Sequence, residues 1–375
     1  MNTIGIDALH LSCLTIKHID WDVLKENPKA SRRSEGWNMQ YAWESISKGD
    51  SEIYQHCTCV MINDNERFYN CVIGVKIVHG NPILYAKIQL IVHHILGHNN
   101  TNMTWDRYNI YVQKLFSQYI PERYGVYLSL DNATISYMEI NLDILLSYSY
   151  DQYERVFRLF MLQLGKRYPG IWEHRNAKDN KSESMKCENK SIAISIYNKT
   201  REAVGWKDPN AEHLLRIEFR LKTADKVQDV FQSRKWSEIT QRDIVNAYHM
   251  LFTKKFRNTH TIWLQRTQTD LRRRLNRYHI QKNGKWVWAR QWARDLREEL
   301  LADEIRMNQI VVLDIEQVDE ALKSMPDVHR NVGKKMVALR KHWGDTREHV
   351  FFHHDLLKVQ EIFNKEYDAY TKSDE

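Results

Sequence analysis

Segments in which apolar and polar residues alternate recur through the first 221 residues of the chain. This period-two pattern is typical of strands that bury one face. It occurs at residues 4–14, 57–62, 68–78, 83–92, 125–129, 134–145, 191–197 and 214–221. Residues 104–119 and 150–168 instead carry apolar side chains at helical spacing. This order predicts an α+β fold, in which helices pack on one side of a mostly antiparallel sheet.

The alternation stops near residue 225, and the pattern is then helical almost to the end. A chain of 375 residues is also too long for one ordinary compact core. We therefore expect a sheet-based domain at residues 1–225 and a mainly helical domain at residues 226–375. A polar, lysine-rich stretch at 175–190 is interpreted as a mobile loop.

No secretory leader and no apolar stretch long enough to span a bilayer is visible in the sequence. We therefore expect a cytoplasmic protein that does not contact a membrane.

Positive charge is concentrated in the helical region. Between Lys254 and Arg297 the sequence has thirteen Lys and Arg residues against only Asp270 and Asp295, with several tryptophans among them. Cations neutralise phosphates and aromatic rings stack on bases, so this segment predicts contact with DNA. The candidate contacts are Arg272, Arg273, Arg274, Arg277, Lys282, Lys285, Trp286 and Arg290. The alternative is a solvated helix whose tryptophans belong to the core.

Tyr197 is the candidate nucleophile, because it ends one alternating segment and shares a side of that strand with Lys199. A tyrosine hydroxyl has a pKa of about 10, so it needs a base, a metal or cationic neighbours to react at neutral pH. Lys199 and Arg201 would provide such a cationic field. The alternative is a packed ring with a solvated hydroxyl, since the chain has 19 tyrosines.

Two further strands carry charged side chains on a single face. In the first strand Glu139, Asn141 and Asp143 share one face, and in the second strand Arg216, Glu218 and Arg220 share one face. Oxygen ligands of this kind suit Mg²⁺ or Mn²⁺, and a carboxylate between two guanidinium groups suits metal binding or phosphate binding. Read separately, the first pattern is more often the solvated face of an antiparallel sheet, and the second is more often a surface ladder of ion pairs.

Histidine contributes little to the expected metal site. No two histidines are separated by a single apolar residue, the spacing that would put both on one strand face. Carboxylates are therefore expected to provide most of the ligands, with His98 as an additional one. The alternative is that His98 caps or turns the loop before the helix at 104–119.

Taken in order, several short motifs resemble the gene II and gene X type replication proteins of filamentous phages, and more distantly the Rep-trans plasmid initiators. The resemblance covers about residues 4–225. Its motifs are Ile6–Leu11 (IDALHL), Leu96–Asn99 (LGHN), Asn132–Ser136 (NATIS), Ile196–Lys199 (IYNK) and Leu215–Glu218 (LRIE). The family typically has Arg-Ile-Asp where this chain has Tyr137-Met138-Glu139, so the role of that arginine has no counterpart here.

The resemblance implies a rolling-circle replication initiator that nicks and rejoins DNA. Tyr197 would attack a phosphodiester and form a 5′-phosphotyrosine link, with Lys199 as the partner of the phosphate or phenolate. Glu139 and Glu218 would be metal-binding or acid-base carboxylates. Residues 1–225 would form the nicking-closing domain, and residues 226–375 a basic DNA-binding or accessory domain.

The implied partners are a replication origin, as single-stranded or supercoiled DNA, and the helicase and polymerase of a bacterial host. Two other function classes remain open at this point. One is a sequence-specific DNA-binding replication protein without catalytic activity. The other is a metal-dependent nuclease that uses water and forms no covalent intermediate.

Overall fold

The structure is a computed structural model of the whole chain. It describes residues 4–32, 59–64, 67–79, 81–91, 103–145, 171–175, 182–199, 214–253, 259–307 and 315–325, with single positions at 150, 157, 161, 177, 334 and 337. The chain divides into two compact units. The first comprises residues 1–150 and 167–251, and the second comprises residues 151–166 and 252–375.

The first unit is built on one large sheet. Its strands are β1 (Ile4–Ile19), β2 (Ala30–Arg32), β3 (Cys59–Asp64), β4 (Phe68–Val78), β5 (Asn81–Ile91), β6 (Val126–Ser129), β7 (Thr134–Leu145), β8 (Ile171–Arg175), β9 (Ser182–Glu188), β10 (Ile192–Asn198) and β11 (Leu214–Leu221). The strand order is β2-β3-β4-β5-β1-β7-β11-β10-β9-β8, with β6 paired to β1, and neighbouring strands run antiparallel.

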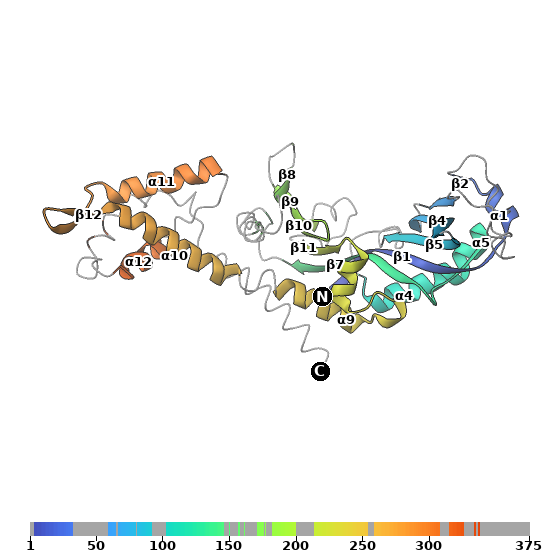
Figure 1. Cartoon of the computed structure of the whole chain (residues 1–375). Coiled ribbons are helices and arrows are strands. Elements are labelled where there is room, and N and C mark those ends of the chain that lie inside the picture. Colours follow the sequence, from blue (N-terminus) through green and yellow to red (C-terminus); the bar gives the residue numbers. More distant parts are fainter. Residues whose placement is uncertain are drawn as a thin grey trace. The chain divides into compact units, whose positions relative to one another are not determined.

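Helical segments of the first unit lie along one side of this sheet, as Figure 1 shows for α4, α5 and α9. The segments are α1 (Trp21–Glu26), α4 (Trp105–Lys114), the π-helical turn η1 (Leu115–Tyr119), α5 (Ile120–Tyr124), α8 (Ala224–Phe231), η2 (Trp236–Glu238) and α9 (Gln241–Phe252). Apolar side chains of alternate strand positions meet them: the Phe219 ring packs edge-on against Tyr248 of α9, with ring centroids 5.2 Å apart. The opposite face of these strands is therefore left for polar side chains.

The second unit is mainly helical. It contains α10 (Thr259–Tyr278), a hairpin of β12 (His279–Lys282) and β13 (Lys285–Trp288), α11 (Trp292–Met307) and α12 (Ile315–Lys323). Its core joins the three helices through Leu271, Leu275, Trp292, Ala293, Leu296, Val318, Ala321, Leu322 and Met325. Among the residues that the structure describes, no helix combines the length and apolar character needed to cross a bilayer.

The α+β fold predicted from the sequence is confirmed. Strands β4, β7 and β11 have the expected bounds, while the helix expected at 150–168 falls almost entirely outside the described residues. The mobile loop expected at 175–190 is wrong, because β9 occupies Ser182–Glu188. Its alternation rests on two apolar residues only, Met185 and Cys187, which are both fully buried. The domain boundary near residue 225 stays a prediction.

Candidate active site

Strand register places the candidate residues on one face of the sheet. Glu218 of β11 lies opposite Asn141 of β7 on one side and opposite Ser195 of β10 on the other. Two residues along the strands, Arg216 lies between Asp143 and Tyr197 in the same way. Directly opposed residues point to the same side of an antiparallel sheet. The face that they share is the one turned away from Phe219 and the helices.

Three carboxylates meet on this face. The nearest oxygens of Asp7, Glu139 and Glu218 all lie within 4.8 Å of one another. We call these three residues the carboxylate cluster. Glu218 is fully buried and Glu139 is 9% exposed, so their charges lie in a poorly solvated environment.

Asp7 was not predicted as a ligand, because a β-bulge in β1 brings it to this face and regular alternation would not. Ile6 pairs with Ile140, and the next register pair joins Ala8 to Glu139, which leaves Asp7 as an extra residue in β1. A signal was present in the sequence: the apolar positions are even at Ile4 and Ile6 and odd at Leu9 and Leu11. Such a change of phase within one strand indicates an inserted residue.

The cluster has an excess of negative charge. Burial, and then the charge of Glu218, raise the pKa of Glu139 to about 8 from its ordinary value of 4.5. Arg220 offsets part of this repulsion, since its Nε lies 3.3 Å from Glu139 Oε1 and also bonds to Glu218. Two buried carboxylates with a third beside them and one shared guanidinium form a site to which a cation would add favourable energy.

Asn141 adds a buried polar side chain to the site. Its side chain is fully buried, and its two amide atoms have no hydrogen-bond partner among the described residues. A buried amide without partners is energetically costly. Oxygen donors from three carboxylates and an amide are the set that Mg²⁺ or Mn²⁺ prefers, so the residues present fit a hard divalent cation.

Tyr197 is half-buried beside the cluster. Its hydroxyl donates to Glu218 Oε2 at 3.2 Å. The ammonium of Lys199 lies 5.8 Å from the centroid of the tyrosine ring, and Lys199 is itself only 4% exposed. The predicted nucleophile and its predicted cationic partner are thus brought together, with a carboxylate placed to accept the phenolic proton.

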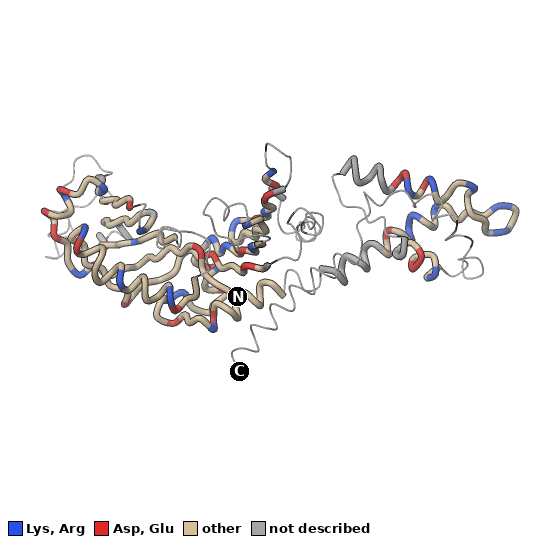
Figure 2. The backbone as a smooth tube through the Cα atoms, turned by 180° about the vertical axis from the view of Figure 1, so that it is seen from behind, with Lys and Arg blue, Asp and Glu red and all other residues tan. Residues whose placement is uncertain are grey.

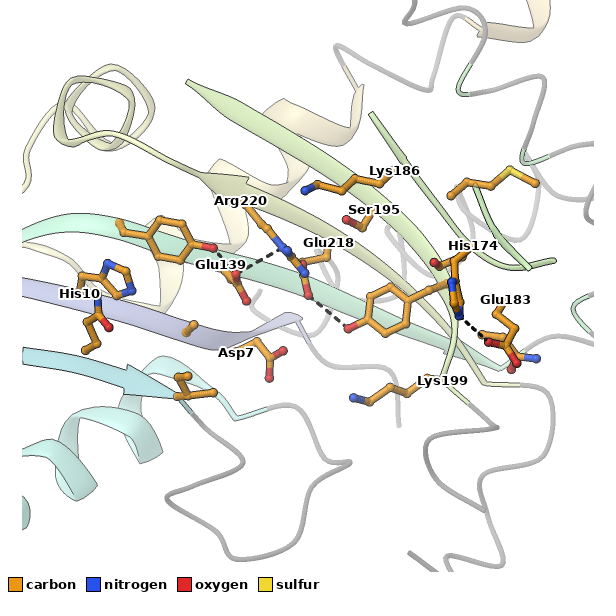
Figure 3. Close-up of a pocket in the computed structure, with 18 residues that line it drawn as sticks. Asp7, His10, Glu139, His174, Glu183, Lys186, Ser195, Lys199, Glu218 and Arg220 are labelled. Carbon is orange, nitrogen blue, oxygen red and sulfur yellow. Dashed lines mark hydrogen bonds and ion pairs between the residues drawn. The ribbon is translucent and has the colours of Figure 1, made fainter. Parts of the chain in front are cut away.

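A continuous chain of hydrogen bonds and ion pairs links two tyrosines through the cluster (Figure 3). Tyr137 donates to Glu139, Arg220 contacts both Glu139 and Glu218, and Tyr197 donates to Glu218. All five side chains line one cavity of about 790 Å³, together with Asp7 and Lys199. Such a cavity can hold a phosphate group next to a phenol, a carboxylate cluster and two cations.

Two of the other predicted site residues, Arg216 and Asp143, form an ion pair with each other. Arg216 Nε and Nη2 bond to the two oxygens of Asp143 at 2.5 and 2.7 Å, and Arg216 Nη1 lies 3.5 Å from Asp7. Arg216 is only 2% exposed. Asp143 is therefore absent from the described carboxylate cluster, and Arg216 holds carboxylates where a DNA phosphate was expected. His98 lies outside the described residues.

Figure 2 marks described Lys and Arg residues of the second unit in blue along the backbone. Those predicted to bind DNA fall into two groups by their contacts. Arg273, Arg274 and Arg277 are paired with Asp270 or Glu299. Arg272, Lys282, Lys285 and Arg290 are exposed and make no ion pair within the described part of the chain. Trp286 lies in β13, and its side chain is outside what the structure describes.

No family model and no curated protein matches the chain. Among solved structures, the rolling circle replication initiator protein from Geobacillus stearothermophilus is similar over 80% of this chain and 96% of its own, with 12% identical residues and a TM-score of 0.26. A likeness at that TM-score supports no conclusion about fold or function.

Proposed function

We propose that the chain is a rolling-circle replication initiator, an enzyme that nicks and rejoins one DNA strand through Tyr197. The observation that carries the proposal is the hydrogen bond of 3.2 Å from the Tyr197 hydroxyl to Glu218, a member of the buried carboxylate cluster. A phenol needs a base and a cationic field to become a nucleophile, and Glu218 and Lys199 would provide them. The motif order shared with the gene II and gene X type proteins agrees with this assignment.

In the proposed reaction, the Tyr197 oxygen forms a bond to phosphorus while the bond from phosphorus to the 3′ oxygen breaks. Glu218 accepts the phenolic proton, and the leaving 3′ oxygen takes a proton from water to become a 3′-hydroxyl. Lys199 and Arg220 offset the negative charge on the phosphate. The 3′-hydroxyl reverses the reaction by attacking the phosphotyrosine, which recloses the strand without ATP because the number of phosphoester bonds is unchanged.

A Mg²⁺ or Mn²⁺ ion, held by Asp7, Glu139 and Glu218, would polarise the phosphate and lower the pKa of the phenol. We propose this set in place of the one expected from the sequence, since Asp143 is paired with Arg216. Arg216 would position Asp7 and would not contact DNA.

The exposed cations of the second unit would bind DNA phosphates. Lys282 and Lys285 lie directly opposite each other next to the Asn283-Gly284 turn of the hairpin, where two like charges repel unless an anion lies between them. The substrate would be a replication origin in a bacterial cytoplasm, with the free 3′-hydroxyl extended by the host polymerase after a host helicase opens the duplex.

The test is covalent capture. Purified protein, Mn²⁺ and labelled single-stranded or supercoiled DNA are incubated, and a protein-DNA adduct is sought on a denaturing gel. We expect an adduct that Tyr197→Phe abolishes. Tyr127→Phe, which changes an exposed tyrosine on β6, is the matched control and should leave the adduct intact.

The other outcomes separate the remaining function classes. Cleavage that persists in Tyr197→Phe without any adduct would instead establish a hydrolytic nuclease. Binding without cleavage, on DNA that carries the origin, would establish a DNA-binding protein without catalytic activity.

A further inference from the structure

The cavity face of the sheet continues from the carboxylate cluster to an exposed tryptophan on β8. We propose that Trp172 is a stacking platform for a base of single-stranded DNA whose scissile phosphate lies at Tyr197 and Glu218. This inference rests on the proposed function. It adds the path of the substrate strand and the residue that holds a base beside the reaction site.

Strand register aligns Trp172 with the reaction site. Trp172 lies opposite Lys186 of β9, Lys186 lies opposite Ser195 of β10, and Ser195 lies opposite Glu218 of β11. Residues directly opposed in antiparallel strands project to the same side, so the indole and the Glu218 carboxylate share one face. Three steps between strands separate them, a distance of about 14 Å, which corresponds to a few nucleotides of a single strand.

Trp172 differs from the core tryptophans of the first unit by its exposure. It is 67% exposed, whereas Trp105 and Trp236, whose rings contact each other, are 2% and 5% exposed. A large aromatic side chain so open to water is informative, because soluble proteins bury most of the surface of their tryptophans. β8 is also the last strand of the described sheet on this side, so within the described sheet no further strand packs beside it.

The residues between Trp172 and the cluster suit a nucleic acid strand. Lys186 and Ser195 both line the cavity, and Figure 3 shows them beside Glu218. His174, two residues from Trp172 on the same face of β8, lines it as well. A cation and a hydroxyl can contact the sugar-phosphate backbone while the indole contacts a base.

The exposed Trp172 ring favours binding of single-stranded DNA over duplex DNA. In a duplex the base faces already stack on one another, so a tryptophan reaches them only where the strand is unpaired. An aromatic platform combined with neighbouring cations is the arrangement by which proteins bind single-stranded DNA without reading its sequence. The platform would hold the strand next to the nick whatever its bases are.

The experiment measures binding without cleavage. All proteins carry Tyr197→Phe, and fluorescence anisotropy gives their affinity for a labelled mixed-sequence single strand and for a fully abasic strand of the same length. Trp172→Ala is compared with Trp172→Phe and with Ile110→Ala. Ile110 is a matched control because it is 60% exposed but lies on α4, on the helical side of the sheet.

We expect Trp172→Ala to weaken binding of the normal strand by roughly 5- to 150-fold, the range for loss of one stacked base. Trp172→Phe should recover much of the affinity, and Ile110→Ala should not change it. The abasic strand should bind equally to the tryptophan and alanine proteins. Equal affinity of Trp172→Ala and its parent for the normal strand would overturn the platform, while adduct formation by the chain with Tyr197 intact would still support the proposed function.

Discussion

The raised pKa of Glu139 makes the stability of the first unit depend on pH. The unfolded chain loses this proton near pH 4.5, and the folded chain keeps it up to about pH 8. Between these values unfolding releases one proton, so a rise in pH favours the unfolded state by about 1.4 kcal/mol per pH unit. The stability is thus fully present at low pH and is lost as the pH rises through the folded-state value.

Glu139→Gln isolates this effect, because glutamine keeps the shape of the side chain and does not titrate. In EDTA, we expect the variant and the wild type to have similar free energies of unfolding at about pH 5. At about pH 8 the variant should be more stable, by up to about 4 kcal/mol over three pH units. Urea unfolding across this range measures the difference.

A control and a refuting result complete this test. Glu122→Gln changes an exposed glutamate on α5, and its difference from the wild type should not follow the same trend. If the difference between Glu139→Gln and the wild type stays constant from about pH 5 to about pH 8, burial and the charge of Glu218 do not hold a proton on Glu139.

Three further predictions concern the residues around this site and the fold that supports it. Arg216→Met leaves the Asp143 carboxylate without its bidentate partner, so the free energy of unfolding should fall by about 3–5 kcal/mol in urea titrations, and a loss below about 1 kcal/mol would contradict this role. Gly125 has a φ of +66°, and a Cβ at this position would lie 2.8 Å from Asp20 Cβ. Gly125→Ala should therefore destabilise the protein by more than about 1 kcal/mol and lower its melting temperature. An unchanged melting temperature would contradict this prediction. Mn²⁺ affinity, measured by calorimetry, should rise about tenfold per pH unit below about pH 8, because Glu139 must lose its proton to bind the ion. Asp7→Asn should lower the affinity at least about tenfold. An affinity that does not depend on pH would exclude Glu139 as a ligand.

Much of the sheet could be predicted from the sequence because most of its strands are amphipathic over several residues. β7 alternates from Met138 to Ile144 and β11 alternates from Leu215 to Leu221, so the shared polar face of Glu139 and Glu218 follows from the period alone. The same rule puts Asp143 on that face. It does not say which neighbour each side chain meets, and register decides this: Arg216 lies directly opposite Asp143 and binds it.

The features that were not predicted depend on weak local signals or on distant parts of the chain. β9 has only Met185 and Cys187 to mark its buried face among polar residues. The hairpin in the second unit follows from Asn283-Gly284, a strong turn signal that the helical pattern around it obscured. The change of phase between Ile6 and Leu9 indicates the bulge, but Asp7 joins Glu139 and Glu218 only after three strands pair.

Because Asp7 lies in a bulge, its place in the carboxylate cluster depends on the number of residues in β1 as well as on the identity of residue 7. Deleting one residue from this part of β1 would remove the register shift at Asp7 and move either Asp7 or Leu9 and Leu11 to the opposite face. The three carboxylates would then no longer meet, although the sequence would still contain Asp7, Glu139 and Glu218. Relatives of this chain are therefore best compared by the spacing between Ile6 and Leu9, because an insertion or deletion there changes the site more than most substitutions do.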